Sequence, residues 1–136
     1  MQVRFVLRAS VPFDEHALEC MRERATILLH ETKHMSERYT QAIVLVSAKG
    51  MEYGAVIQNA LSKEKEDETA LMEMLSLQGD TEIRYVLCMW EDGGIDVPSM
   101  AFRQMLLTLD PKNAESVLLL MTDNGVQGVQ LSKTMK

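Results

Sequence analysis

Residues 42–46 read Ala-Ile-Val-Leu-Val, an uninterrupted apolar run that is rich in β-branched side chains. Such a run predicts a strand that is covered on both faces, which requires a layer of structure above and below the sheet. Lys49-Gly50 predicts a turn after this strand, and residues 53–57 predict the returning strand of a hairpin. The centre of the fold is therefore expected to be a sheet that lies between two other layers.

Helices are expected on both sides of this hairpin along the chain. Apolar residues recur every three or four positions from Glu15 to about Tyr39, which predicts a long amphipathic helix. The same kind of spacing predicts shorter helices over residues 66–77 and 100–109. Further strands are expected over residues 2–8, 83–90, 116–121 and 126–131. The order β-α-β-β-α-β-α-β-β predicts an α/β fold, a three-layer α/β/α sandwich with a mixed sheet, in one domain spanning residues 1–136.

The composition argues against several classes of protein. The 136 residues include 14 Lys and Arg and 20 Asp and Glu, a formal net charge of −6 with His neutral. Because nucleic-acid binding relies on a basic face, we expect no broad nucleic-acid surface. No apolar run approaches the roughly 20 residues of a membrane span, and no signal-peptide pattern is found. Two cysteines, Cys20 and Cys88, cannot form a disulfide framework, so a cytoplasmic protein with free thiols is expected.

Residues 30–34 read His-Glu-Thr-Lys-His and match the zinc-peptidase pattern H-E-x-x-H. In such a site two His one turn apart bind the metal, and the Glu acts as a base toward bound water. On a helical wheel, however, His30 and His34 point away from the apolar stripe, and Lys33 places a cation between them. A polar outer face of the helix is the preferred interpretation, and a zinc peptidase-like site at His30-Glu31-His34 is the minor one.

Three further segments form a pattern when they are taken together. Residues 54–60 read GAVIQNA, residues 66–71 read EDETAL and residues 98–104 read PSMAFRQ. Their order and spacing resemble the small cytidine deaminases, zinc hydrolases that convert cytidine to uridine. In that family the three segments are of the types G-x-N-x-E-N-A, C-A-E-R-T-A and P-C-x-x-C-R-Q. The resemblance runs from about Leu18 to Met135 and implies the family's fold, preceded here by an extra N-terminal strand.

The resemblance implies a zinc site, but the ligands of that site are replaced here. The three ligand positions hold Glu66, Ser99 and Phe102, and the last two are Cys in the family. Phenylalanine has no lone pair to offer, and a serine hydroxyl is a poor ligand beside thiolate or imidazole. Thr69 replaces an Arg that supports the thiolates in the family. The chain thus resembles a degenerate member without the zinc ligands, and neither zinc nor another cofactor is expected.

The other positions that the resemblance assigns to the pocket are altered as well. Val56 and Gln58 stand where the family binds ribose, and Tyr39 stands near its base-stacking Phe. Glu68 keeps an acid at the position of the proton shuttle, although another placement of a one-residue gap puts Asp67 there. Acids in a first helical turn are also what the helix dipole favours, so a structural role stands beside retained proton transfer.

The expected function is therefore a binding or assembly role without deaminase activity. The resemblance implies a nucleoside-like ligand and a homo-oligomer, either a dimer or a tetramer. The enzymatic alternative is a remodelled nucleoside or nucleobase hydrolase, in which Glu66 and Glu68 form an acid/base pair. Two carboxyl groups whose pKa values are pushed apart by a dry pocket are able to do such work.

Overall fold

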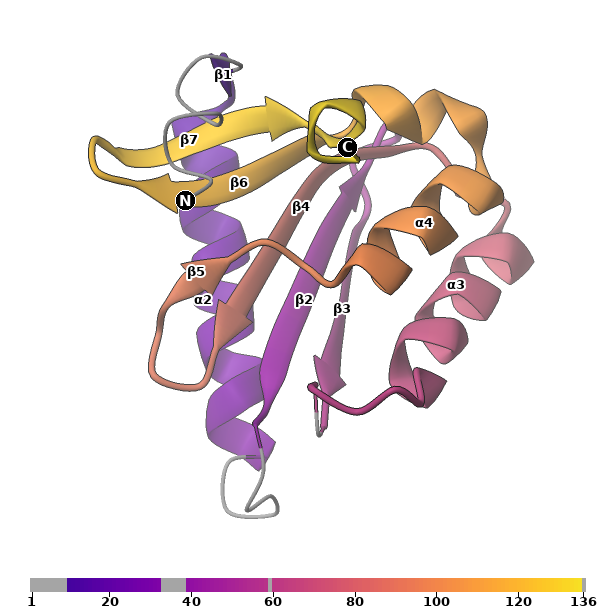
Figure 1. The fold of residues 1–136 in the computed structure, drawn as a ribbon, viewed down its shortest axis with the longest axis horizontal. Helices are drawn as coiled ribbons and strands as arrows, with labels where there is room; N and C mark the ends of the chain where they lie inside the picture. Colours follow the sequence, from indigo (N-terminus) through magenta and orange to yellow (C-terminus); the bar gives the residue numbers. More distant parts are fainter. Residues whose placement is uncertain (1–9, 33–38, 59, 136) are drawn as a thin grey trace.

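A mixed β-sheet forms the middle layer of the molecule (Figure 1). The structure is a computed structural model that describes residues 10–32, 39–58 and 60–135. In this part of the chain the strands are β1 Ser10–Val11, β2 Gln41–Ser47, β3 Glu52–Ile57, β4 Ile83–Trp90, β5 Ile95–Asp96, β6 Val117–Thr122 and β7 Gly125–Gln130. They pair in the order β1-β7-β6-β4-β2-β3, with β5 on β4. β4 and β6 are parallel and the other pairs are antiparallel, which confirms the expected mixed sheet.

Helices cover the two faces of this sheet. The helices of the described residues are α2 Glu15–Thr32, α3 Glu66–Gln78 and α4 Met100–Leu109, with short 3₁₀ turns η2 Pro111–Glu115 and η3 Leu131–Thr134. Figure 1 shows α2 on one face and α3 with α4 on the other. The three-layer α/β/α sandwich is therefore confirmed. None of these helices is long and apolar enough to cross a membrane.

The strand β2 separates two hydrophobic clusters. Ile43 and Leu45 pack into the cluster that also holds Leu71 and Leu75 of α3 and Phe102 of α4. The alternate residues of β2 are Ala42 and Val44, and these pack into the cluster on the α2 side. Side chains of a strand alternate between the faces of the sheet, so a strand between two helical layers needs an apolar residue at every position. The continuous apolar run is explained by this placement.

Helix ends follow the local chemistry of the sequence. The Oδ1 atom of Asp14 accepts the N–H of His16 at 2.9 Å, and thereby satisfies a free donor at the start of α2. The Oγ atom of Ser99 accepts the N–H of Phe102 at 3.1 Å in the same way at the start of α4. Gly79 ends α3 in the left-handed conformation, with φ at 65°. These three helix ends are therefore stabilised by residues next to them in the sequence.

Some predicted boundaries differ from the structure. The first helix was expected to reach about residue 39, but Tyr39 is not helical, and its carbonyl accepts the N–H of Ala60 at 2.8 Å. The Tyr39 carbonyl thus accepts a hydrogen bond from a loop that is distant in the sequence, and not from the residue four positions later, as it would in a helix. The expected end of that helix over residues 33–38 and the expected strand over residues 2–8 lie outside the described residues. β5 was not expected, because two residues carry no periodic signal.

A network of buried hydrogen bonds connects α4, η2 and the sheet. The Oδ1 atom of Asn113, which is wholly buried, accepts the N–H of Ile83 at 2.8 Å. Its Nδ2 atom donates to the carbonyl of Thr81 at 3.0 Å and to that of Leu106 at 2.9 Å. The buried hydroxyl of Ser116 donates to the carbonyl of Ile83 at 2.6 Å. The side chain of Asn113 is thus satisfied by three backbone groups from two segments, residues 81–83 and α4.

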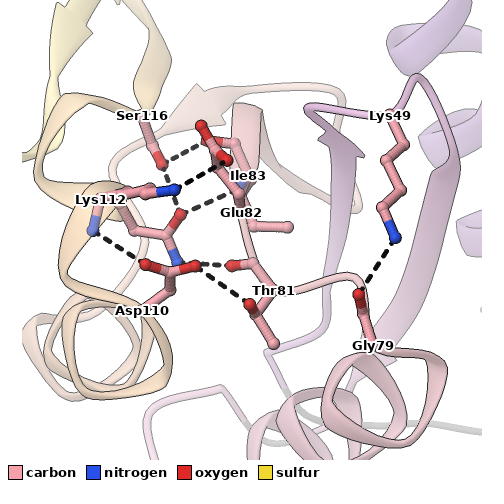
Figure 2. Close-up of polar contacts among 9 residues, drawn as sticks. Lys49, Gly79, Thr81, Glu82, Ile83, Asp110, Lys112 and Ser116 are labelled. Atoms are coloured by element: carbon pink, nitrogen blue, oxygen red, sulfur yellow. Dashed lines mark hydrogen bonds and ion pairs between the residues drawn. The ribbon is translucent and has the colours of Figure 1, made fainter.

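The rim of this network is formed by Thr81, Glu82, Asp110 and Lys112 (Figure 2). The Oγ1 atom of Thr81 donates to Asp110 at 3.0 Å, and Asp110 also accepts the backbone N–H of Lys112 at 3.0 Å. The ammonium group of Lys112 lies 3.9 Å from Glu82, with both side chains largely in solvent. Exposed pairs of this kind contribute little to stability. The buried amide of Asn113, rather than the ion pair at the rim, therefore fixes how α4 approaches the sheet.

Candidate functional site

The first turn of α3 carries three consecutive acids in different environments. Successive residues of a helix are rotated by 100°, so neighbouring side chains cannot share one direction. Glu66 is exposed, Asp67 is half-buried and Glu68 is buried. The Oδ2 atom of Asp67 accepts the backbone N–H of Gln58 at 3.0 Å, which connects α3 to the chain that follows β3. The pair of Glu66 and Glu68 therefore places one carboxyl group in solvent and the other inside the protein.

Glu68 is the carboxylate that points into the molecule, and Lys65 is its cationic partner. The Nζ atom of Lys65 lies 3.8 Å from Oε2 of Glu68 and donates to the carbonyl of Ala60 at 3.1 Å. A buried charge is costly unless an opposite charge or hydrogen bonds compensate it. Lys65 was not expected at the site, because in the sequence it belongs to an ordinary run of exposed charges.

The first turn of α4 uses its polar groups to maintain its own structure. The hydroxyl of Ser99 caps the helix, and the ring of Phe102 is wholly buried. Arg103 donates from Nε to the carbonyl of Pro98 at 3.0 Å and from Nη1 to the carbonyl of Thr134 at 2.7 Å. Burial lowers the pKa of this guanidinium, which nevertheless stays charged at neutral pH. These residues hold the helix start against the C-terminal turn.

Cys88 of β4 lies in the buried cluster that also holds residues of α3 and α4. Phe102 and Cys88 belong to one buried cluster. Burial raises the pKa of the Cys88 thiol, and the charges of Asp96 and Glu68 raise it further. Asp96 pairs with Cys88 in the sheet, and its Oδ2 atom accepts the indole N–H of Trp90 at 3.0 Å.

An aromatic pair, Tyr39 and Trp90, lies next to Asp96. The rings of Tyr39 and Trp90 meet edge to face, with centroids 6.2 Å apart and an interplanar angle of 79°. Tyr39 is 62% exposed, so one face of its ring is available to a ligand. Trp90 was not expected at the site. Its position at the end of a predicted strand was the only feature of the sequence that favoured a place there. Of the predicted pocket residues on β3 and after it, Val56 is half-buried and Gln58 is exposed.

The residues at the three ligand positions do not suit a zinc ion. Glu66 extends into solvent, the hydroxyl of Ser99 is engaged in capping, and Phe102 is a hydrocarbon ring. A protein zinc site needs at least three nitrogen, sulfur or carboxylate donors that converge. Among the residues that the structure describes, no three His, Cys, Asp or Glu side chains are arranged in this way.

The described part of the H-E-x-x-H segment lies on the exposed side of α2. His30 and Glu31 are exposed near the end of the helix, while His34 lies outside the described residues. The apolar residues that face the sheet are Leu18, Met21, Ala25 and Leu29. The exposure of His30 agrees with the interpretation of this segment as a polar helix face.

The layered order of strands and helices defines a cytidine deaminase-like fold. The cytidine deaminase of Mycobacterium leprae has a similar structure, with a TM-score of 0.63 and 16% sequence identity over 87% of this chain and 96% of that one. A mutant form of cytidine deaminase from Mycobacterium tuberculosis gives a TM-score of 0.66 and 18% identity over 90% of this chain and 95% of that one.

A third similar structure is the cytidine deaminase of Burkholderia pseudomallei, with a TM-score of 0.50 and 15% identity over 78% of this chain and 91% of that one. No family model matches the sequence, and no curated protein matches it significantly. At these identities the likeness establishes the fold alone.

The raised pKa of the Cys88 thiol predicts a loss of stability in alkaline solution. An unfolded cysteine ionises near its usual pKa of 9.0, whereas the folded protein keeps Cys88 protonated. Above about pH 9 the unfolded state therefore binds fewer protons, and the free energy of unfolding falls by up to about 1.4 kcal/mol per pH unit from this group. Denaturant unfolding between pH 8 and pH 10 measures this slope. In Cys88→Ala the free energy of unfolding should fall less steeply with pH. Equal slopes in the two proteins would show that Cys88 does not cause the loss of stability.

Proposed function

We propose that this chain binds a nucleoside-like ligand and does not catalyse zinc-dependent deamination. The observation that carries the proposal is the wholly buried ring of Phe102 at the start of α4, where the resemblance to cytidine deaminases calls for a thiolate. Hydrolytic deaminases of this kind depend on a metal-activated water. Glu66, Ser99 and Phe102 offer no set of donors that would hold such a metal.

Binding is supported by the groups that surround the start of α3. The exposed face of Tyr39, set against Trp90, offers a stacking surface for a heteroaromatic ring. Glu68 supplies a buried carboxylate that is able to accept a hydrogen bond from an exocyclic amino group. Val56 has no polar atom for ribose, so most of the affinity is assigned to the base. The thiols of Cys20 and Cys88 are both free, which is consistent with a cytoplasmic location.

Nucleosides should raise the melting temperature without being converted. At a ligand concentration about 100 times the Kd, binding adds about 2.7 kcal/mol to the free energy of unfolding and raises the melting temperature by several degrees. The measurement is a thermal-shift titration with cytidine, uridine, their free bases and ribose, together with a chromatographic assay for uridine.

Trp90→Leu provides the control for this titration, because it removes one ring of the aromatic pair and should abolish the shift. Formation of uridine that is lost in Glu68→Gln would show that the protein is an enzyme. If none of the ring compounds raises the melting temperature, the binding role is refuted.

We also propose that copies of the chain associate through the outer surface of α3 and α4. Leu77 is 86% exposed there, and Met74 and Met100 are also exposed. A groove of about 460 Å³ runs between the two helices, lined by Thr69, Met72, Ala101, Gln104, Met105, Thr108 and Leu109. Apolar surface of this kind commonly marks an interface.

Light scattering should therefore give a mass two or four times the 15.4 kDa of one chain. Leu77→Asp places a charge on the proposed interface and should shift the mass toward that of a monomer. Met121→Asp is the matched control, because Met121 is an exposed apolar residue of β6, away from α3 and α4. A monomeric wild-type protein would refute the proposed association.

A further inference from the structure

His16 and Cys20 form a base and nucleophile pair on the outer side of α2. The Sγ atom of Cys20 lies 3.6 Å from Nε2 of His16, and both residues are exposed. Residues four apart lie one above the other on a helix, so the helix itself holds the thiol beside the imidazole. The cap by Asp14, which accepts the N–H of His16, fixes this turn of the helix.

We propose that Cys20 is a modification site that undergoes thiol–disulfide exchange with small neutral or cationic disulfides, with His16 as the base. The imidazole accepts the thiol proton while Sγ attacks one sulfur of the disulfide. A new S–S bond forms to Cys20, the original S–S bond breaks, and the other half leaves as a thiolate. The imidazolium then returns the proton to the leaving thiolate or to water. No net oxidation or reduction takes place beyond the exchange of partners.

The charge around this pair selects the disulfide. Glu19 and Glu23 lie on the same helix face as His16 and Cys20, at spacings of three and seven residues from His16. Arg24 lies one turn beyond Cys20, and its guanidinium is engaged at 2.9 Å with Glu52 of β3. The remaining negative charge disfavours an anionic reagent within about one Debye length. A disulfide of a small amine is therefore preferred over a disulfide that bears carboxylates.

In the described part of the chain, a tyrosine of the sheet contacts this end of α2. The hydroxyl of Tyr85 on β4 accepts the backbone N–H of Asp14 at 3.0 Å. Cys88 serves as an internal reference, because it is wholly buried and burial raises the pKa of its thiol. One chain thus contains an accessible thiol beside a base and a buried thiol without access. Both residues belong to α2, which lies on the opposite face of the sheet from α3 and α4 (Figure 1).

The test compares the reaction of the folded protein with cystamine and with oxidised glutathione at low ionic strength. Intact-mass and peptide analysis should locate a single mixed disulfide on Cys20, with Cys88 unmodified. His16→Gln should lower the rate constant with cystamine at least about threefold and change the pH–rate profile. Cystamine should react faster than oxidised glutathione at equal concentration, and the double variant Glu19→Gln/Glu23→Gln should reduce that preference.

Cys20→Ser is the negative control, because it lacks the thiol that is expected to react. Unchanged melting temperatures of all variants show that the fold is intact. An unaltered rate and pH profile in His16→Gln would overturn the role of the imidazole. Equal rates for the two disulfides would overturn the selectivity for cationic reagents, and equal labelling of Cys88 would overturn the site itself.

Discussion

Asn113→Ala is expected to lower the free energy of unfolding by about 4 kcal/mol, one of the largest losses available from a single residue of this chain. The substitution removes the acceptor for the N–H of Ile83 and the donor for the carbonyls of Thr81 and Leu106, all at the buried junction of α4 and the sheet. Each buried polar group left without a partner costs about 1–3 kcal/mol. Native domains are stable by only about 5–15 kcal/mol, so the melting temperature should fall by roughly 15 °C.

Two variants make this prediction specific. Lys112→Ala changes the neighbouring residue, whose side chain is 73% exposed, and should cost less than about 0.5 kcal/mol. Ser116→Ala removes one buried hydroxyl at the edge of the network and should cost about 1.5 kcal/mol, which stays measurable if Asn113→Ala is too unstable to purify. Chemical denaturation gives all three values. A loss below 1 kcal/mol for Asn113→Ala would mean that the network does not secure α4.

Much of the fold was predictable because its causes are local. The run over residues 42–46 is apolar at every position because the strand has a helical layer on each side. Asp14, Ser99 and Gly79 act within one turn of their own helix, so their roles follow from the sequence alone. Patterns of this kind need no knowledge of distant contacts.

The rest of the fold and site depends on partners that are far apart in the chain. Asn113 reads as a turn residue after Pro111, and only the structure brings it to Ile83, 30 residues away. Tyr39 was expected near a stacking position, but its ring contact with Trp90 depends on the pairing of β2 with β4. A single sequence contains no signal for such pairs, because each member alone has an ordinary structural explanation.

The replaced ligand positions lead to the prediction with the largest expected effect, which is a change in the amount of bound zinc. The triple substitution Glu66→Cys, Ser99→Cys and Phe102→Cys should convert a protein with less than about 0.1 equivalent of bound zinc into one with about one equivalent. Removing the buried ring of Phe102 costs about 3–5 kcal/mol. A structural zinc site is able to contribute about 10–16 kcal/mol, so the metal should more than restore the lost stability.

Metal analysis after dialysis measures the bound zinc, and Co²⁺ substitution reports thiolate ligands through their charge-transfer absorption. The double substitution Glu66→Cys/Ser99→Cys is the control, because it keeps Phe102 and supplies only two thiolates, too few for a tetrahedral protein site. A folded triple variant without metal would show that the starts of α3 and α4 do not converge as they do in a zinc deaminase. Stoichiometric zinc in the wild-type protein would show instead that other residues bind the metal, and would remove the reason for assigning this chain a binding role without chemistry.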